Sequence, residues 1–180
     1  MSYVRTTSGE WPDLSSYATS GTPEGWGIGD RFKNYTFVDQ YGEEVELYQF
    51  WGNVVLVDFS AGWCPPCRAV ARDAEAKYRG LADDGFVIVH MMIDDNQNGG
   101  GITDPGFVES WATEYGLTFP VVDFDDEWQE VGPGLAGTGL YTGGIPDAVE
   151  LAAQVALEGV GRLDRAEPAA RGDAGEHLLV

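Results

Sequence analysis

An apolar run leads directly into the only two cysteines of the chain, in the stretch Val54-Val55-Leu56-Val57-Asp58-Phe59-Ser60-Ala61-Gly62-Trp63-Cys64-Pro65-Pro66-Cys67. Nearly continuous apolar residues predict a buried strand of a helix-covered sheet. A strand that delivers a Cys-x-x-Cys pair to the start of a helix is an arrangement for reversible dithiol–disulfide chemistry. The stretch therefore predicts a central strand with a redox site at its end.

A helix is expected over residues 65–83, because helix-forming residues dominate there and small or apolar ones recur every three or four positions. Pro65 and Pro66 suit its first turn, where a missing N–H costs nothing. Cys64 then lies at the helix N-terminus, whose partial positive charge stabilises a thiolate. We predict that Cys64 is the attacking and more accessible thiol, and that Cys67 is the resolving thiol.

Two other roles for the cysteine pair are disfavoured. A structural zinc ion requires four ligands, whereas the pair supplies two, and His90 and His177 are far apart in the sequence. A structural disulfide across two intervening residues would constrain little of the unfolded chain. The predicted redox chemistry itself needs no metal and no organic cofactor.

Three segments together resemble the thioredoxin superfamily, most closely the TlpA/ResA-like thiol–disulfide oxidoreductases. They are a hairpin-like segment at residues 32–47, the strand and cysteine motif at 52–67, and the short segment Gly144-Ile145-Pro146-Asp147. The resemblance implies an α/β, thioredoxin-like fold with a central mixed β-sheet flanked by helices and an N-terminal β-hairpin extension. It also implies an enzyme that exchanges a Cys-Pro-Pro-Cys dithiol or disulfide with protein substrates and with a redox partner.

The resemblance also implies a substrate groove. In this superfamily a cis-proline faces the two sulfurs and presents backbone to an extended peptide, and cis bonds are accessible mainly before proline. That part falls to Pro146, with Ile145 flanking the groove, unless Pro146 is an ordinary loop proline; Pro120 competes, although it is better placed to open a strand. The predicted substrate-binding residues are Trp63, Pro65, Pro66, Ile145 and Pro146.

Asp58 is the third predicted catalytic residue, beside Cys64 and Cys67. Thioredoxins carry a buried acid six residues before the first cysteine, and the resemblance assigns Asp58 the transfer of a proton from the resolving thiol. Desolvation raises the pKa of a buried carboxyl group that lacks a partner, which suits proton exchange with a thiol. The alternative interpretation is that Asp58 lies at a solvated strand end and has no role in proton transfer. The chain departs from ResA-like proteins at Val70 and Arg72, where they carry an acid and a proline.

Composition restricts the partners and the compartment. Thirty acidic against ten basic residues give a formal net charge of −20, which argues against binding nucleic acid or an anionic membrane. The sequence contains no run of 18 apolar residues, so it predicts no membrane span. Residues 1–29 do not form an intact signal peptide. An extracytoplasmic protein, periplasmic or membrane-anchored with its signal removed, is favoured over a cytoplasmic one.

Alternation of strands and helices predicts a parallel sheet covered by helices. We expect a hairpin over 35–38 and 44–47, strands over 53–59, 86–93, 120–123 and 147–151, and helices over 65–83, 105–115 and 126–132. The domains expected are an irregular extension at 1–30, a thioredoxin-like domain at 31–161 and a poorly structured tail at 162–180. His90 is interpreted as a core residue of its strand, and residues 94–104 as a solvated loop without a calcium site.

Two alternative functions remain open. A peroxiredoxin-like thiol peroxidase shares the implied fold, but peroxiredoxins carry a threonine where this chain has Ala61. A non-enzymatic redoxin-like module that binds a partner or a metal is the other alternative, and the two-residue cysteine spacing argues against a copper chaperone.

Overall fold

The computed structural model describes residue 11 and residues 24–27, 30–51, 53–96, 100–138 and 153–156. Four strands form one mixed sheet in the order β5-β4-β3-β6. Strands β3 (Val54–Ala61), β4 (Phe86–Asp94) and β5 (Val121–Asp123) are parallel, and β6 (Ala153–Ala156) runs antiparallel to β3. The α/β, thioredoxin-like class predicted from the sequence is confirmed.

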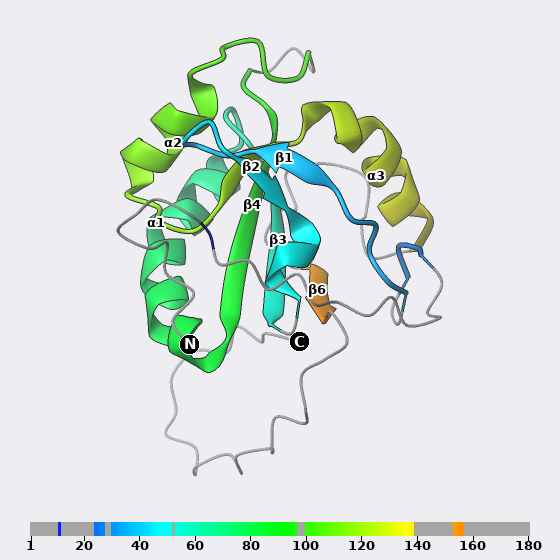
Figure 1. Cartoon of the computed structure of the whole chain (residues 1–180). Helices are drawn as coiled ribbons and strands as arrows, with labels where there is room; N and C mark the ends of the chain where they lie inside the picture. Colours follow the sequence, from blue (N-terminus) through cyan, green and yellow to red (C-terminus); the bar gives the residue numbers. More distant parts are fainter. Residues whose placement is uncertain are drawn as a thin grey trace, which may run out of the picture.

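Helices cover both faces of this sheet (Figure 1). Helices α1 (Pro65–Leu81) and α2 (Phe107–Tyr115) cover one face, where their side chains pack with residues of β4 and β5. Helix α3 (Asp125–Thr138) covers the other, together with the antiparallel hairpin β1 (Thr36–Val38) and β2 (Glu44–Glu46). Short 3-10 helices η1 (Leu47–Phe50) and η2 (Ala82–Asp84) follow β2 and α1.

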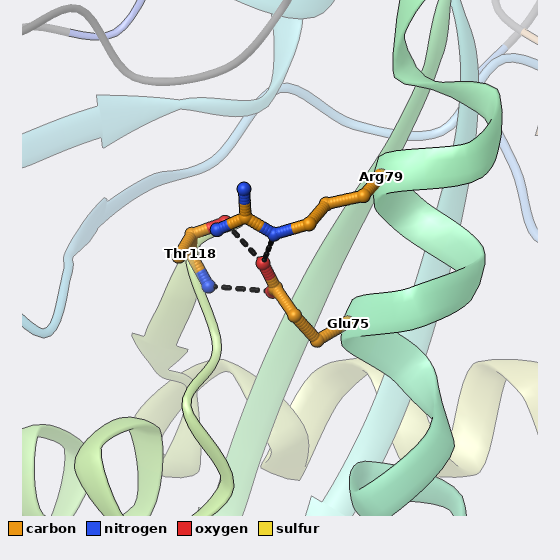
Figure 2. A network of polar contacts seen from close by, with 3 residues as sticks. All are labelled: Glu75, Arg79 and Thr118. Carbon is orange, nitrogen blue, oxygen red and sulfur yellow. Dashed lines mark hydrogen bonds and ion pairs between the residues drawn. The ribbon is translucent and has the colours of Figure 1, made fainter.

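A polar network fixes α1 against the segment that leads into β5 (Figure 2). Glu75 on α1 accepts hydrogen bonds from the backbone N–H of Thr118 at 2.8 Å and from its hydroxyl at 2.6 Å. Arg79, one turn later, forms an ion pair with the same carboxylate and donates to the Thr118 hydroxyl. Because α1 begins at the cysteine motif, this network helps to fix the orientation of the helix that carries it.

The hairpin is attached to the outer edge of β5. Asp39 forms an antiparallel bridge with Val122, and the Gln40 side chain donates to the carbonyl of Phe119 and accepts from the N–H of Val121, both at 2.9 Å. Trp11 is also buried here and donates to the Asp39 carboxylate at 2.7 Å. The residue lies within the extension predicted to be irregular, so at least this position packs on the folded domain.

Most expected elements are confirmed within one or two residues, with one large difference. Helix α3 is twice as long as the expected 126–132 helix and continues through Pro133 and three glycines. The buried side chains of Val131 and Leu135 hold it against the core. The strand expected at 147–151 lies outside the described residues, whereas the described strand β6 begins at Ala153.

Candidate active site

The cysteine motif begins where β3 leaves the sheet. The pairing of β3 with β4 shifts by one residue between Ser60 and Ala61, so that Ala61 pairs with Asp94. Such a bulge turns the following residues away from the strand direction, and bulges are frequent beside active sites. Position 62, which follows the bulge, requires glycine, because a Cβ there would lie 2.7 Å from both the backbone oxygen of Asp95 and the ring of Phe107. The loop before the cysteines is thus tightly packed against the ends of β4 and α2.

Cys64 and Cys67 form a disulfide with their Cα atoms 5.3 Å apart. Cys64 is the N-cap of α1, and its sulfur accepts from the backbone N–H of Cys67 at 3.2 Å. The predicted place of Cys64 at a helix N-terminus is confirmed, with Pro65 and Pro66 in the first turn. In the disulfide form Cys64 is 0 % and Cys67 1 % exposed, and the greater accessibility of the reduced Cys64 thiol stays a prediction.

Arg68 holds the loop from the helix side. Its Nε donates to the carbonyl oxygen of Gly62 at 2.9 Å, and a second guanidinium nitrogen donates to the same oxygen. The guanidinium carbon also lies 5.6 Å from the ring centre of Trp111 on α2. The residue after the second cysteine therefore links the loop before the first cysteine to α2.

The predicted substrate-binding residues are only partly placed. Trp63 is half-buried and packs against the core cluster that contains both cysteines, and its buried indole nitrogen has no hydrogen-bond partner in the described part of the chain. Pro65 is exposed and Pro66 half-buried at the start of α1. Ile145 and Pro146 lie outside the described residues, so the predicted cis-proline groove stays a prediction.

Asp58 is buried as predicted, but it does not lack a partner. It faces His90 in the β3–β4 register, and its Oδ2 lies 2.7 Å from Nδ1 of that histidine. The contact is close without being an aligned hydrogen bond, since Nδ1 makes no hydrogen bond of acceptable geometry. This contact corrects the expectation of a partnerless carboxyl group, whereas the prediction that His90 is a core residue of its strand is confirmed by its full burial.

His90 and Trp111 are the site residues that the sequence analysis missed. The indole Nε1–H of Trp111 donates to Nε2 of His90 at 3.0 Å, and both side chains are buried. The sequence does mark Asp58 and His90 as unusual, because they are polar residues inside two apolar strands. Only the parallel register shows that they face each other.

A further acidic group, Asp123, ends β5 at the edge where the parallel strands finish and where β3 delivers the cysteines. Burial, together with the charges of Asp125 and Asp126 and against a lowering by the N–H of Asp125, raises the pKa of Asp123 to about 6. This pKa lies within reach of neutral pH. In the neighbouring loop the Asp95 carboxylate accepts three hydrogen bonds from Thr103 and Asp104, which organise that loop.

A disulfide between the two cysteines of a Cys-x-x-Cys pair, at a helix N-terminus in a thioredoxin-like fold, defines a class of thiol-redox proteins. The AhpC/TSA family model matches residues 28–131, and the chain belongs to this family. The match covers the hairpin, β3 to β5 and half of α3. The resemblance to thioredoxin-superfamily oxidoreductases of the ResA-like group is confirmed by relatives of that name.

Curated relatives share about half of the chain. The thiol-disulfide oxidoreductase ResA of Halalkalibacterium halodurans is 31 % identical over 94 residues, which are 52 % of this chain and 49 % of that protein. The ResA of Bacillus subtilis is 26 % identical over 89 residues, or 49 % of this chain and 45 % of that protein. The chain thus spans about half the length of the curated relatives it matches.

Solved structures of similar shape carry related names. A thioredoxin domain of a thiol-disulfide oxidoreductase from Bacteroides vulgatus has a TM-score of 0.48 and 21 % identity, covering 64 % of this chain and 74 % of that one. A secreted Mycobacterium tuberculosis disulfide oxidoreductase has a TM-score of 0.44 and 20 % identity, covering 53 % and 65 %.

Proposed function

We propose that this protein is an enzyme that exchanges its Cys64–Cys67 dithiol or disulfide with cysteines of protein substrates. The observation that carries the proposal is the disulfide itself, formed by the only two cysteines with Cys64 as the N-cap of a 17-residue helix. A helix N-terminus stabilises a developing thiolate at that position. Membership of the AhpC/TSA family and the ResA relatives support it.

The reducing direction proceeds in two exchanges. The Cys64 thiolate attacks a substrate disulfide, so that a Cys64–substrate S–S bond forms and one substrate thiolate leaves. The Cys67 thiol then loses its proton and attacks the Cys64 sulfur, which forms the Cys64–Cys67 bond and releases the second substrate thiolate. In the oxidising direction the same steps run in reverse. We assign the acceptance of the Cys67 proton to Asp58, six residues before Cys64 on β3.

Replacement of each cysteine in turn tests the assignment. Reduced protein is mixed with a disulfide substrate such as insulin, and release of thiols is followed. Cys64→Ser should abolish exchange, whereas Cys67→Ser should accumulate a mixed disulfide that mass spectrometry detects. Exchange that persists in Cys64→Ser, or a mixed disulfide at Cys67 in that variant, would reject the assignment of the attacking thiol.

Asp58→Asn tests the proton acceptor. An amide cannot take up the Cys67 proton, so we expect the exchange rate near neutral pH to fall roughly tenfold or more. Removal of a buried charge can at the same time stabilise the fold. Asp73→Asn, an exposed carboxylate on α1, is the matched control. An unchanged rate and pH profile in Asp58→Asn would leave Asp58 with a structural role, and the thiols would exchange protons with solvent.

Two functions compete with disulfide exchange: peroxide reduction, and the binding of a partner or a metal. The AhpC/TSA match is the reason for testing peroxide reduction. Ala61 offers no hydroxyl to position a peroxide, so hydrogen peroxide should be consumed by the reduced protein much more slowly than insulin is reduced. A titration with copper or zinc tests the second. Within the described residues, no group of three or more histidine, cysteine, aspartate or glutamate side chains could hold a metal ion.

We further propose that the protein acts outside the cytoplasm, on protein thiols and with a redox partner of its own. The resemblance to TlpA/ResA-like oxidoreductases supports this location. None of the helices in the described ranges is both long and apolar enough to cross a bilayer. Fractionation of cells that produce the protein, followed by immunoblotting, tests the location; recovery in the cytoplasmic fraction alone would contradict it.

A further inference from the structure

The buried contact between Asp58 and His90 has a defined hydrogen position, because Trp111 restricts it. An indole N–H is a donor only, so Nε2 of His90 must accept from Trp111 and cannot itself carry hydrogen. The hydrogen of the neutral ring is then on Nδ1, 2.7 Å from Oδ2 of Asp58. The opposite tautomer would place two N–H groups against each other on one side and two lone pairs on the other.

Within the described residues, the other contacts of His90 are with aromatic side chains. The ring is 0 % exposed, stacks on Trp111 with 6.0 Å between ring centres, and has the Phe119 ring on another side at 6.3 Å. Asp58 from β3 is the titratable group that faces it. From α1, the Arg68 guanidinium lies against Trp111 rather than against the imidazole. The Tyr115 ring on α2 also packs against Trp111, with 4.7 Å between ring centres.

The hydrogen on Nδ1 determines where Asp58 can bind a proton. Oδ2 lies 2.7 Å from Nδ1 and its hydrogen, and an oxygen that binds a proton loses much of the negative charge that favours this contact, so a proton on Oδ2 is disfavoured. The other carboxylate oxygen, Oδ1, is free of this conflict. A proton could pass from Oδ2 to the imidazole only if Nδ1 lost its hydrogen, which the Trp111 donor disfavours. The carboxyl group therefore carries the exchangeable proton, and the imidazole does not.

We propose that Trp111 locks His90 in the tautomer with hydrogen on Nδ1, beside Oδ2 of Asp58, so that Asp58 accepts the Cys67 proton on Oδ1 and His90 is its positioning residue. The role in proton transfer rests on the proposed function, whereas the tautomer does not. In the reaction, the Cys67 S–H bond breaks, an Oδ1–H bond forms on Asp58, and the freed thiolate attacks Cys64. The departing substrate thiolate is protonated in return, from Asp58 or from solvent.

Nitrogen NMR of protein labelled with ¹⁵N-histidine at pH 7.5 tests the lock directly. The chain has only two histidines, and His177→Gln assigns their signals. We expect His90 as a single tautomer with hydrogen on Nδ1, and a mixture of tautomers in Trp111→Phe, which keeps an aromatic ring without the donor. Trp51→Phe, directly after η1, is the matched control and should change nothing. Hydrogen on Nε2 in the unaltered protein, or no change in Trp111→Phe, would overturn the proposal.

A pair of His90 variants tests the positioning role without a protein substrate. The amide nitrogen of His90→Asn takes the place of Nδ1 and keeps an N–H beside Asp58, whereas His90→Gln reaches the place of Nε2 and keeps only the acceptor for Trp111. The rate at which dithiothreitol reduces the Cys64–Cys67 disulfide is measured against pH. We expect His90→Asn to keep the midpoint of the profile and His90→Gln to move it by roughly half a pH unit or more.

The outcomes separate the two proposals. Equal pH profiles in His90→Asn and His90→Gln would reject the positioning role, whatever the activity on proteins. A locked tautomer with different profiles in the two variants, together with no exchange on protein disulfides, would instead leave the His90 lock standing and reject the proposed function.

Discussion

Arg68 donates two hydrogen bonds to the carbonyl oxygen of Gly62, so the residue after Cys67 holds the loop that precedes Cys64. A guanidinium presents two parallel donors that an ammonium group cannot reproduce. Arg68→Lys should therefore destabilise the oxidised protein by about 1 kcal/mol in denaturant unfolding. It should also speed reduction of the disulfide by dithiothreitol, because the loop is less restrained. Arg72→Lys, exposed on the same helix, is the control, and equal effects of both substitutions would contradict the clamp.

Glu75 should contribute to stability through Thr118 rather than through Arg79. Its side chain is mostly buried and accepts two hydrogen bonds from Thr118, whereas the Arg79 side chain is more than half exposed. Glu75→Ala should lower the free energy of unfolding by about 2 kcal/mol, because the partly buried N–H and hydroxyl of Thr118 lose their acceptor. Arg79→Ala should cost well under 1 kcal/mol, as exposed ion pairs do. A larger loss from Arg79→Ala than from Glu75→Ala would contradict this order.

Two glycines of α3 should respond in opposite ways to alanine. A Cβ on Gly134 would overlap the Trp26 indole, whereas one on Gly137 meets nothing within 4 Å. Alanine in a helix interior is otherwise favoured over glycine by about 1 kcal/mol, and Gly137→Ala, at the next-to-last residue of α3, should gain less than this. Gly134→Ala should instead destabilise the protein by about 1–3 kcal/mol through overpacking. Thermal unfolding of both variants decides; a gain from both would show that Trp26 moves aside freely.

Asp123 should make the fold less stable as pH rises. Burial, with the charges of Asp125 and Asp126, raises its pKa to about 6 from 3.8. Because the folded state binds this proton more tightly, the stabilisation is complete below about pH 4 and is lost as pH rises through about 6. Asp123→Asn keeps an acceptor for the Asp125 N–H and should match the unaltered protein at pH 4. At pH 7 it should be more stable by about 1 kcal/mol, a value reduced for solvent screening. Equal stabilities at pH 7 would contradict the raised pKa.

Local signals allowed the cysteine site to be predicted from the sequence. The apolar run, the two prolines and the helix-forming residues after Cys67 all act within one or two turns, so the Cys64 cap was predictable. The partner of Asp58 was not, because His90 is far along the chain and only the parallel register of β3 and β4 brings them together. Trp111 joins them from α2, through packing that no residue pattern specifies.

In helix α3, local residue preferences predict a shorter helix than the structure has. Gly132, Pro133 and Gly134 predict a break after residue 132, since glycine and proline disfavour helix interiors. The helix continues because Val131 and Leu135 are buried in the core and because the missing Cβ of Gly134 makes room for Trp26. Tertiary packing here outweighs local preference, and the sequence gives no local sign of it.

The side chain of Gln40 has a consequence for association between molecules. A strand at the border of a sheet normally offers unpaired N–H and C=O groups, which another chain can use as a template for aggregation or strand exchange. At β5 the amide of Gln40 occupies two of these positions, and the Asp39–Val122 bridge lies next to them. One glutamine thus acts as a substitute for a neighbouring strand. It leaves fewer unpaired backbone groups at this border of the sheet for another chain to pair with.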